Sequence, residues 1–288
     1  MRAAGSTEPL ASRWTLVTLA DHFDIRSPSL AGAVGELRPD GVLHLAGLTS
    51  VMDSFREPEQ YFDVNFHGTW NLLRALRECQ FKGRMVFVSS GDCYGAVGPE
   101  HLPVSEERPL RPRSPYAVSK VAAESLCYQW SQGGAFDIVV ARPFNHVGRG
   151  QDVRFAVASF ARQAALIRAG RAAPSIVTGN LDVTRDLTDV RDVVSAYFAL
   201  LEAGVPGEAY NVGSGRETSM RDVLNTLAAI AGIEPEIRVD PLRMRADEQR
   251  RAVADIGKIR HDTGWSATIP LQATLADVLD DWSGRIEP

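Results

Sequence analysis

The sequence predicts an α/β fold in which a doubly wound parallel sheet carries a smaller C-terminal lobe. Short β-branched apolar runs alternate with longer segments whose apolar residues recur every three or four positions. This order of strand, helix and strand requires crossover connections and therefore a parallel sheet. The run 84–90 is apolar without alternation, as expected for a strand that helices cover on both faces. With 288 residues, the chain has the length for one large domain or a domain with a smaller partner.

The individual elements follow from these patterns. Strands are expected at residues 15–19, 41–46, 84–90 and 137–141, with helices between them at 65–80 and 115–130. After about residue 145 the rhythm changes, and the sequence predicts helices at 155–169, 192–203 and 220–231, a strand at 209–212 and an amphipathic tail. We therefore interpret residues 1–145 as a first domain and residues 146–288 as a substrate lobe, with segments near 180–203 returning to the first domain.

Composition and charge exclude several classes of function. The net charge is −5, so no global positive field favours nucleic acid as the main ligand. The three cysteines, Cys79, Cys93 and Cys127, contain no close pair, which argues against a disulfide framework and against a metal site, and favours a reducing, cytoplasmic compartment. No apolar run approaches the roughly 18 residues of a membrane span, and residues 1–9 contain no signal-peptide core.

The strongest candidate site combines Ser90, Tyr116 and Lys120. Tyr116 and Lys120 are four residues apart at the start of a helix opened by Ser114 and Pro115, so both side chains project from one helix face. A neighbouring ammonium stabilises a phenolate and is expected to lower the tyrosine pKa from about 10. Ser90 ends the apolar strand, at the carboxyl edge where open α/β sheets bind ligands. On its own, the Tyr-x-x-x-Lys spacing is more often a solvated helix pair.

Three motifs that contain or adjoin these residues occur in the order typical of a known enzyme family. They are Ser-Ser-Gly-Asp-Cys-Tyr-Gly at 89–95, Ser-Pro-Tyr-Ala-Val-Ser-Lys at 114–120 and Arg-Pro-Phe-Asn at 142–145. Together they resemble the extended short-chain dehydrogenase/reductase family of nucleotide-sugar enzymes, over nearly the whole chain. The resemblance implies a Rossmann-like dinucleotide-binding domain, NADPH or NADH as cofactor, a homodimer, and Ser90, Tyr116 and Lys120 as catalytic residues.

The resemblance also assigns residues to the cofactor. The expected contacts are Asp24, Ile25, Leu45, Ala46, Gly47, Asn65, Tyr116, Lys120, Arg142 and Pro143. Asn65 both caps a helix and braces the active-site loop, whereas His44 is interpreted as a core histidine because its strand offers no metal partners.

The expected phosphate-binding turn is the one departure from the family. The family opens with a strand and a Gly-x-x-Gly-x-x-Gly turn that holds the pyrophosphate, but residues 1–10 contain only Gly5. About 15 residues of strand and turn are missing by the usual geometry. A start recorded too far downstream, a truncation and weak dinucleotide binding all stay open as explanations.

The C-terminal third narrows the substrate. The segment from Asp240 to Trp265 resembles GDP-mannose 4,6-dehydratases and, more closely, GDP-4-keto-6-deoxy-mannose reductases. The substrate residues that this implies are Ser90, Asn145, Arg185, Arg216, Arg245 and Glu248. A glutamate carboxylate suits the N–H donors of guanine, and arginines suit diphosphate oxygens. The alternative for the arginine-rich run 243–251 is a solvated basic turn.

The reading that follows is a reductase of polysaccharide biosynthesis. It would use NAD(P)H to reduce the 4-keto group of GDP-4-keto-6-deoxy-D-mannose, giving GDP-D-rhamnose or its C4 epimer. The dehydratases carry Thr-x-Glu where this chain has Ser90-Gly91-Asp92, and Asp92 is kept as a fourth candidate catalytic residue. A 4,6-dehydratase is thus the first alternative, followed by a 4-epimerase and a non-catalytic nucleotide-sugar binding protein.

Overall fold

A four-stranded parallel sheet forms the centre of the structure, a computed structural model that describes residues 13–19, 23–244 and 249–286. Its strand order is β1-β2-β3-β7, with β1 at Gly41–His44, β2 at Arg84–Val88, β3 at Asp137–Pro143 and β7 at Ala209–Val212. Leu43 lies opposite Val86, which in turn lies opposite Val139. The predicted parallel sheet is thereby confirmed, while the expectations for residues 1–10 lie outside the described residues.

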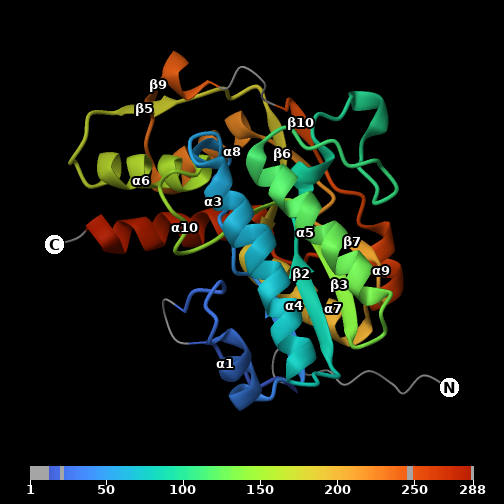
Figure 1. Ribbon diagram of the computed structural model, residues 1–288. Helices are drawn as coiled ribbons and strands as arrows, with labels where there is room; N and C mark the ends of the chain where they lie inside the picture. The colour runs from blue at the N-terminus through green and yellow to red at the C-terminus, as the bar shows by residue number, and fades with distance from the viewer. Residues whose placement is uncertain (1–12, 20–22, 245–248, 287–288) are drawn as a thin grey trace.

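Helices cover both faces of this sheet (Figure 1). One layer contains α1 (Leu30–Leu37), α4 (Gly68–Glu78) and α5 (Pro115–Ser131), and the other contains α7 (Val190–Ala203) and α9 (Gly257–Thr263). Met85 and Phe87 pack into the first layer, whereas Val86 packs into the second. Because both faces of β2 are buried, the strand has no polar side, as its unbroken apolar run predicts.

A second core lies in the C-terminal portion. Its helices are α6 (Ala156–Arg168), α8 (Met220–Ala231) and α10 (Leu271–Ile286), and they pack around Phe160, Leu224 and Leu279. Its strands are β4 (Asn145–Val147), β6 (Thr184–Asp189), β8 (Glu217–Ser219) and β10 (Arg251–Ala252) in one sheet, and β5 (Ser175–Thr178) with β9 (Glu236–Val239) in another. Helices α6 and α10 and strands β5 and β9 lie on the left of Figure 1, and β6 and β10 lie at its upper centre.

Short elements fill several of the remaining connections. They are α2 (Val51–Ser54), α3 (Pro58–Phe62), the π-helical turn η2 (Asp63–His67), and the 3-10 turns η3 (Gly91–Tyr94), η4 (Pro99–His101) and η5 (Pro241–Arg243). Among the described residues, no helix has the length and apolar character needed to cross a membrane.

Three expected elements differ from the structure. Residues 14–19 form no strand; Trp14 packs near Gly41, while Leu16 and Val17 are 73% and 59% exposed. The predicted helix 65–80 starts inside the π-helical turn η2, which joins α4 at Gly68. Helix α7 begins earlier than expected because the Asp189 side chain caps it by accepting the Arg191 N–H.

Candidate active site

The turn at residues 89–95, which we call the serine turn, follows the carboxyl end of β2. Ser90 starts η3, and its Oγ accepts the Asp92 N–H at 3.1 Å. The turn closes at Gly95, whose φ is +67° and where a Cβ would lie 1.9 Å from the Arg111 carbonyl oxygen. Only glycine fits this closure, so the backbone that presents Ser90 and Asp92 has a defined shape.

Helix α5 brings Tyr116 and Lys120 beside this turn. Ser114 caps the helix by accepting the Ala117 N–H at 3.1 Å, which fixes the point where the helix begins. Tyr116 is 7% exposed and Lys120 is 4% exposed. The Lys120 Nζ donates to the Val88 carbonyl oxygen at 2.9 Å, and the Ser90 side chain hydrogen-bonds to Tyr116. The structure therefore brings together the three residues that the sequence singled out.

The electrostatics differ from the expectation for Tyr116. Burial raises its pKa above the ordinary value, more than the hydrogen bond to Ser90 lowers it, and the nearby Asp92 charge raises it further. Burial also lowers the pKa of Lys120 to about 8. The predicted lowering of the Tyr116 pKa by Lys120 is wrong for this arrangement, because the removal of the phenolate from water dominates the shift. Tyr116 is accordingly protonated at neutral pH.

Asn65 joins the end of β1 to α5. Its Oδ1 accepts the Leu48 N–H at 2.8 Å, and its Nδ2 donates to the Leu48 carbonyl at 3.1 Å and to Ser119 Oγ at 2.9 Å. A Cβ on Gly47 would lie 2.9 Å from Asn65 Oδ1 and 3.3 Å from Lys120 Nζ. The backbone after β1 thus runs directly beside Lys120, and the exposed side chains of Leu45 and Ala46 precede it.

Other residues assigned to the cofactor have side chains engaged within the protein. Asp24 is exposed, and its carboxylate accepts hydrogen bonds from the Arg26 side chain at 3.0, 3.1 and 2.7 Å and from the Arg26 backbone N–H at 2.8 Å, which lower its pKa to about 2. The Ile25 side chain is buried against Gly68. The Arg142 guanidinium is buried against Glu124, and Pro143, the last residue of β3, is also buried. Their role at the cofactor stays a prediction.

His44 is a core residue, as interpreted from the sequence. It is buried, and its Nε2 lies 2.9 Å from Thr69 Oγ1. The Thr69 hydroxyl donates to the Asn65 carbonyl oxygen at 2.6 Å, so His44 is the donor to Thr69. Burial, with a smaller contribution from the Lys120 charge, lowers the pKa of His44 to about 3, which keeps the ring neutral.

Of the expected substrate residues, Ser90 lies in the serine turn, and Asn145, Arg185 and Arg216 lie in the C-terminal portion. Asn145 is exposed in β4, directly after β3. Arg185 lies in β6 and donates to the Thr184 carbonyl oxygen at 2.7 Å, while Arg216 is exposed in the loop before β8. Arg245 and Glu248 lie outside the described residues. Across the part of the chain that is described, no group of His, Cys, Asp and Glu side chains could hold a metal ion.

Sequence reasoning missed two buried carboxylates that support these loops. Glu124 receives the Ser89 hydroxyl at 2.8 Å and the Arg142 guanidinium. Asp186 receives the Ser214 and Gly215 amides at 2.8 and 3.0 Å. The only signal for Glu124 was its position four residues after Lys120, on the same helix face; we found no signal for Asp186.

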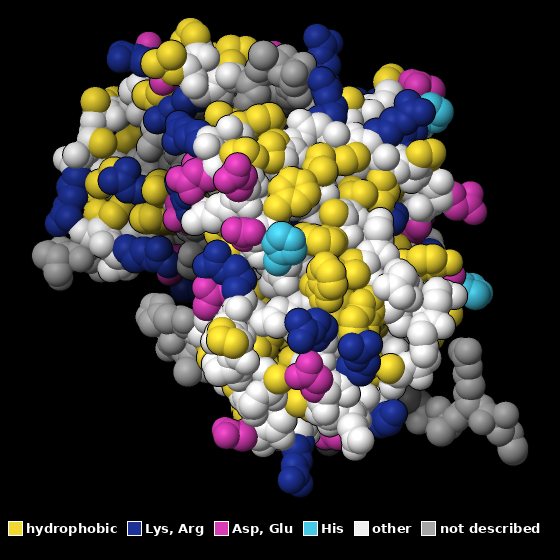
Figure 2. Space-filling view, viewed as in Figure 1, with side chains coloured by type: hydrophobic (Ala, Val, Ile, Leu, Met, Phe, Trp, Pro, Cys, Tyr) yellow, Lys and Arg dark blue, Asp and Glu magenta, His cyan; other side chains and the backbone are white. Residues whose placement is uncertain are grey.

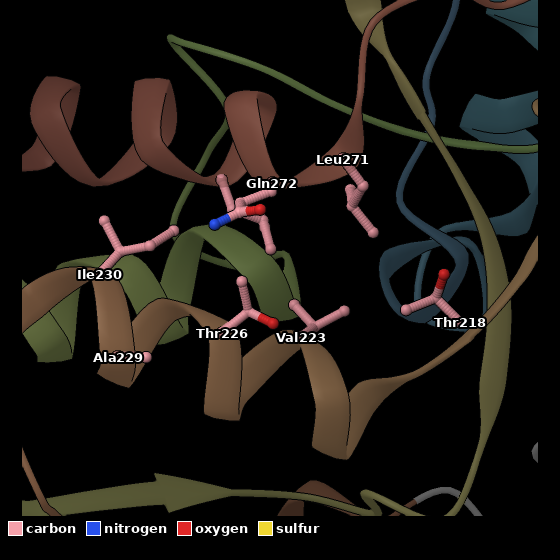
Figure 3. Close-up of a pocket in the computed structure, with 8 residues that line it drawn as sticks. Thr218, Val223, Thr226, Ala229, Ile230, Leu271 and Gln272 are labelled. Atoms are coloured by element: carbon pink, nitrogen blue, oxygen red, sulfur yellow. The ribbon is translucent and has the colours of Figure 1, made fainter.

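A groove of about 530 Å³ lies elsewhere, between α8 and α10 (Figure 3). Its walls carry mainly apolar side chains, among them Val223, Ile230 and Leu271, with Thr226 and Gln272 also facing it. None of its lining residues belongs to the predicted site.

Comparison with known proteins gives a consistent family. The family model described as GDP-mannose 4,6 dehydratase matches residues 15–278. The GDP-6-deoxy-D-mannose reductase of Pseudomonas aeruginosa is 44% identical over 273 residues, which cover 95% of this chain and 90% of that protein. The structure of RMD from Pseudomonas aeruginosa complexed with NADPH aligns with a TM-score of 0.88 and 42% identity, covering 98% and 92% of the two chains. A Thermus thermophilus UDP-glucose 4-epimerase in complex with NAD aligns with a TM-score of 0.81 and 32% identity, covering 92% and 84%.

Proposed function

The chain belongs to the GDP-mannose 4,6-dehydratase family, and from this membership we propose that it reduces the 4-keto group of GDP-4-keto-6-deoxy-D-mannose with NADPH or NADH. The observation that carries the proposal is the buried set of Ser90, Tyr116 and Lys120 at the carboxyl end of β2, in a chain 44% identical to a GDP-6-deoxy-D-mannose reductase. The product is GDP-D-rhamnose or its C4 epimer, a donor for polysaccharide biosynthesis.

The residues present fit the nicotinamide end of a dinucleotide. Leu45 directly follows the carboxyl end of β1 and is 57% exposed. Its apolar side chain is therefore available to a ligand at this edge of the sheet. The absence of a Cβ at Gly47 leaves the backbone there in close contact with Asn65 and Lys120. We propose that Lys120, Asn65 and residues 45–47 hold the cofactor. When bound, the cofactor supplies the hydride that reduces C4.

Side chains of the chain donate the proton and stabilise the negative charge that develops on the ketone oxygen. Ser90 donates a hydrogen bond to the ketone oxygen, and Tyr116 gives its proton to that oxygen as it becomes an alkoxide. The raised pKa of Tyr116 keeps the proton in place until the alkoxide forms. Lys120, held by the Val88 carbonyl, contributes positive charge beside both Tyr116 and the backbone of residues 45–47.

The nucleotide end is assigned to the C-terminal portion. We propose that Arg185 and Arg216 bind the diphosphate, that Asn145 contacts the sugar or phosphate, and that Arg245 and Glu248 recognise guanine. The exposed position of Arg216, in a loop that Asp186 holds, supports this assignment.

Dehydration is the second candidate reaction, and Asp92 is the observation that favours it. Its carboxylate is exposed in the serine turn, and its charge influences the pKa of Tyr116. A dehydratase needs an extra acid or base to remove water across C5 and C6. Incubation with GDP-mannose and NADP, with the product analysed by mass spectrometry, separates the two: loss of water identifies a dehydratase.

The Tyr116→Phe variant tests the proposed reductase. Without the phenol, turnover of the keto sugar should fall by about 10²–10⁴-fold, the usual scale for general acid catalysis, while binding of NADPH stays unchanged. Consumption of NADPH measures turnover, and fluorescence titration measures binding. Tyr128→Phe is the matched control, because Tyr128 lies on the same helix and is 57% exposed. Wild-type turnover in Tyr116→Phe would remove the assignment.

We also propose a cytoplasmic homodimer that pairs through α4 and α5. Figure 2 shows hydrophobic side chains gathered over these two helices, and Trp70 and Val118 are 47% and 39% exposed there. Such a patch commonly marks a protein interface. The free thiols of Cys79, Cys93 and Cys127 suit a reducing compartment. Sedimentation of the purified chain measures the oligomeric state.

A further inference from the structure

We propose that Glu124 is a positioning residue for the reduction: it holds both ends of the serine turn against α5 and so fixes Ser90 relative to Tyr116. The inference rests on the proposed reductase activity. Glu124 itself touches neither the reacting groups nor Tyr116 in the contacts described above, and it acts through Ser89 and Arg142.

The first end of the serine turn is held directly. The Ser89 hydroxyl donates to Glu124 Oε2 at 2.8 Å. Ser89 immediately precedes Ser90, and its own N–H donates to the Ala141 carbonyl oxygen of β3 at 2.7 Å. The backbone that enters the catalytic serine is therefore fixed on one side by the sheet and on the other side by Glu124.

The second end is held through Arg142. The Arg142 Nε donates to both Glu124 oxygens, at 3.1 and 3.2 Å. Its Nη1 donates to the Tyr94 hydroxyl at 2.9 Å, and the guanidinium carbon lies 5.1 Å from the centre of the Tyr94 ring. Tyr94 is the last residue of η3 and donates in turn to Asn211 Oδ1 at 2.7 Å. Ser90 thus lies between two anchors that meet at one carboxylate.

The anchor is built into the catalytic helix. Glu124 lies four residues after Lys120 and eight after Tyr116 on α5, so the same rigid element carries the proton donor and the group that holds the serine turn. Glu124 and Arg142 are both 7% exposed. Because water cannot replace either partner at this depth, the two side chains are held in one relative position. A displacement of about 1 Å at a reacting group can cost about 100-fold in rate.

Two variants distinguish a positioning role from a purely structural one. The variant with the lower melting temperature is expected to keep the higher kcat. Glu124→Gln keeps the shape and a hydrogen-bond partner for Ser89 and Arg142, but it leaves the buried guanidinium without a counter-charge. It should melt at a clearly lower temperature, with kcat within about 3-fold of wild type when measured below that transition. The double variant Glu124→Leu/Arg142→Met removes both charges and both anchors. It should melt near wild type, with kcat reduced about 10- to 100-fold.

Ser89→Ala and Cys127→Ala complete the design. Ser89→Ala removes only the first anchor and should lower kcat about 3- to 10-fold, with the KM for the keto sugar unchanged. Cys127→Ala is the control for general destabilisation, because Cys127 lies in the apolar core one turn further along α5; it should lower the melting temperature and leave kcat unchanged.

The outcomes are distinct. If kcat follows melting temperature across the four proteins, Glu124 has only a structural role and the inference is overturned. An unchanged kcat in the double variant and in Ser89→Ala overturns it as well. If the wild-type chain binds NADPH but does not reduce the keto sugar, the proposed function fails first, and the positioning role in that reaction fails with it.

Discussion

Two buried carboxylates support the two halves of the candidate site, and they are satisfied in different ways. Glu124, behind the serine turn, is paired with the guanidinium of Arg142. Asp186, in β6, is fully buried, and its described donors are neutral N–H and O–H groups. Its oxygens accept the Ser214 amide and hydroxyl at 2.8 and 2.6 Å and the Ala254 amide at 3.1 Å.

The difference shows what each carboxylate can fix. Glu124, on α5, joins Ser89 of the serine turn to Arg142 of β3, so it sets the distance between packed elements. Asp186 gathers the backbone of the loop 213–216, so it sets the shape of the segment that carries Arg216. We infer that the first arrangement governs the chemical step and that the second governs binding of the nucleotide sugar.

Removing the counter-charge of Glu124 should give the largest effect on stability. In Arg142→Met, the buried carboxylate loses its partner, and the free energy of unfolding should fall by about 3–5 kcal/mol. Urea unfolding followed by circular dichroism measures this. The double variant Glu124→Leu/Arg142→Met should return to within about 1 kcal/mol of wild type. A loss as large in the double variant as in Arg142→Met would mean that packing, rather than charge pairing, holds this region.

The charge on Lys120 should make stability depend on pH. Its pKa is 10.5 as a reference value and about 8 in the fold, so between these values the unfolded chain binds more protons than the native chain. The free energy of unfolding should therefore rise with pH across this interval, by up to about 3 kcal/mol from this group. Tyr116 acts in the opposite direction above pH ~10, because its folded pKa is raised.

The Lys120→Met variant isolates this contribution. Urea unfolding of wild type and variant at a series of pH values between about 7 and 10 gives the difference curve. The variant should lack the rise, whereas Ser214→Ala, made beside Asp186, should keep it. Parallel curves for wild type and Lys120→Met would contradict the lowered pKa.

The same contrast explains what the sequence could predict. The unbroken apolar run at 84–90 predicts a strand, and the apolar periodicity at 115–130 predicts a helix. Local spacing predicts the set of Ser90, Tyr116 and Lys120, because each of these signals lies within a few neighbouring residues. The Glu124–Arg142 pair spans 18 positions, and the contact of Asp186 with Ala254 spans 68. Neither pairing has a local pattern. The raised pKa of Tyr116 was missed for a related reason, since spacing shows the neighbouring lysine but not the depth of burial.

The smallest expected effects come from removing one hydroxyl group near each of the two carboxylates. The two variants should lose the same free energy of unfolding but should differ in which kinetic parameter changes. Tyr94→Phe removes the hydroxyl between Arg142 and Asn211, and Ser214→Ala removes the one that donates to Asp186 and accepts the Arg216 N–H. Each should lower the free energy of unfolding by about 1 kcal/mol.

Tyr94→Phe should loosen the serine turn and lower kcat about 3- to 10-fold at constant KM, since it weakens contacts made only in the transition state. Ser214→Ala should loosen the loop of Arg216 and raise the KM for the keto sugar by a similar factor at constant kcat. Steady-state kinetics on both variants, with Tyr128→Phe as the exposed control, decides the matter. If both deletions change the same kinetic parameter, the inference that Glu124 governs the chemical step and Asp186 governs substrate binding is wrong.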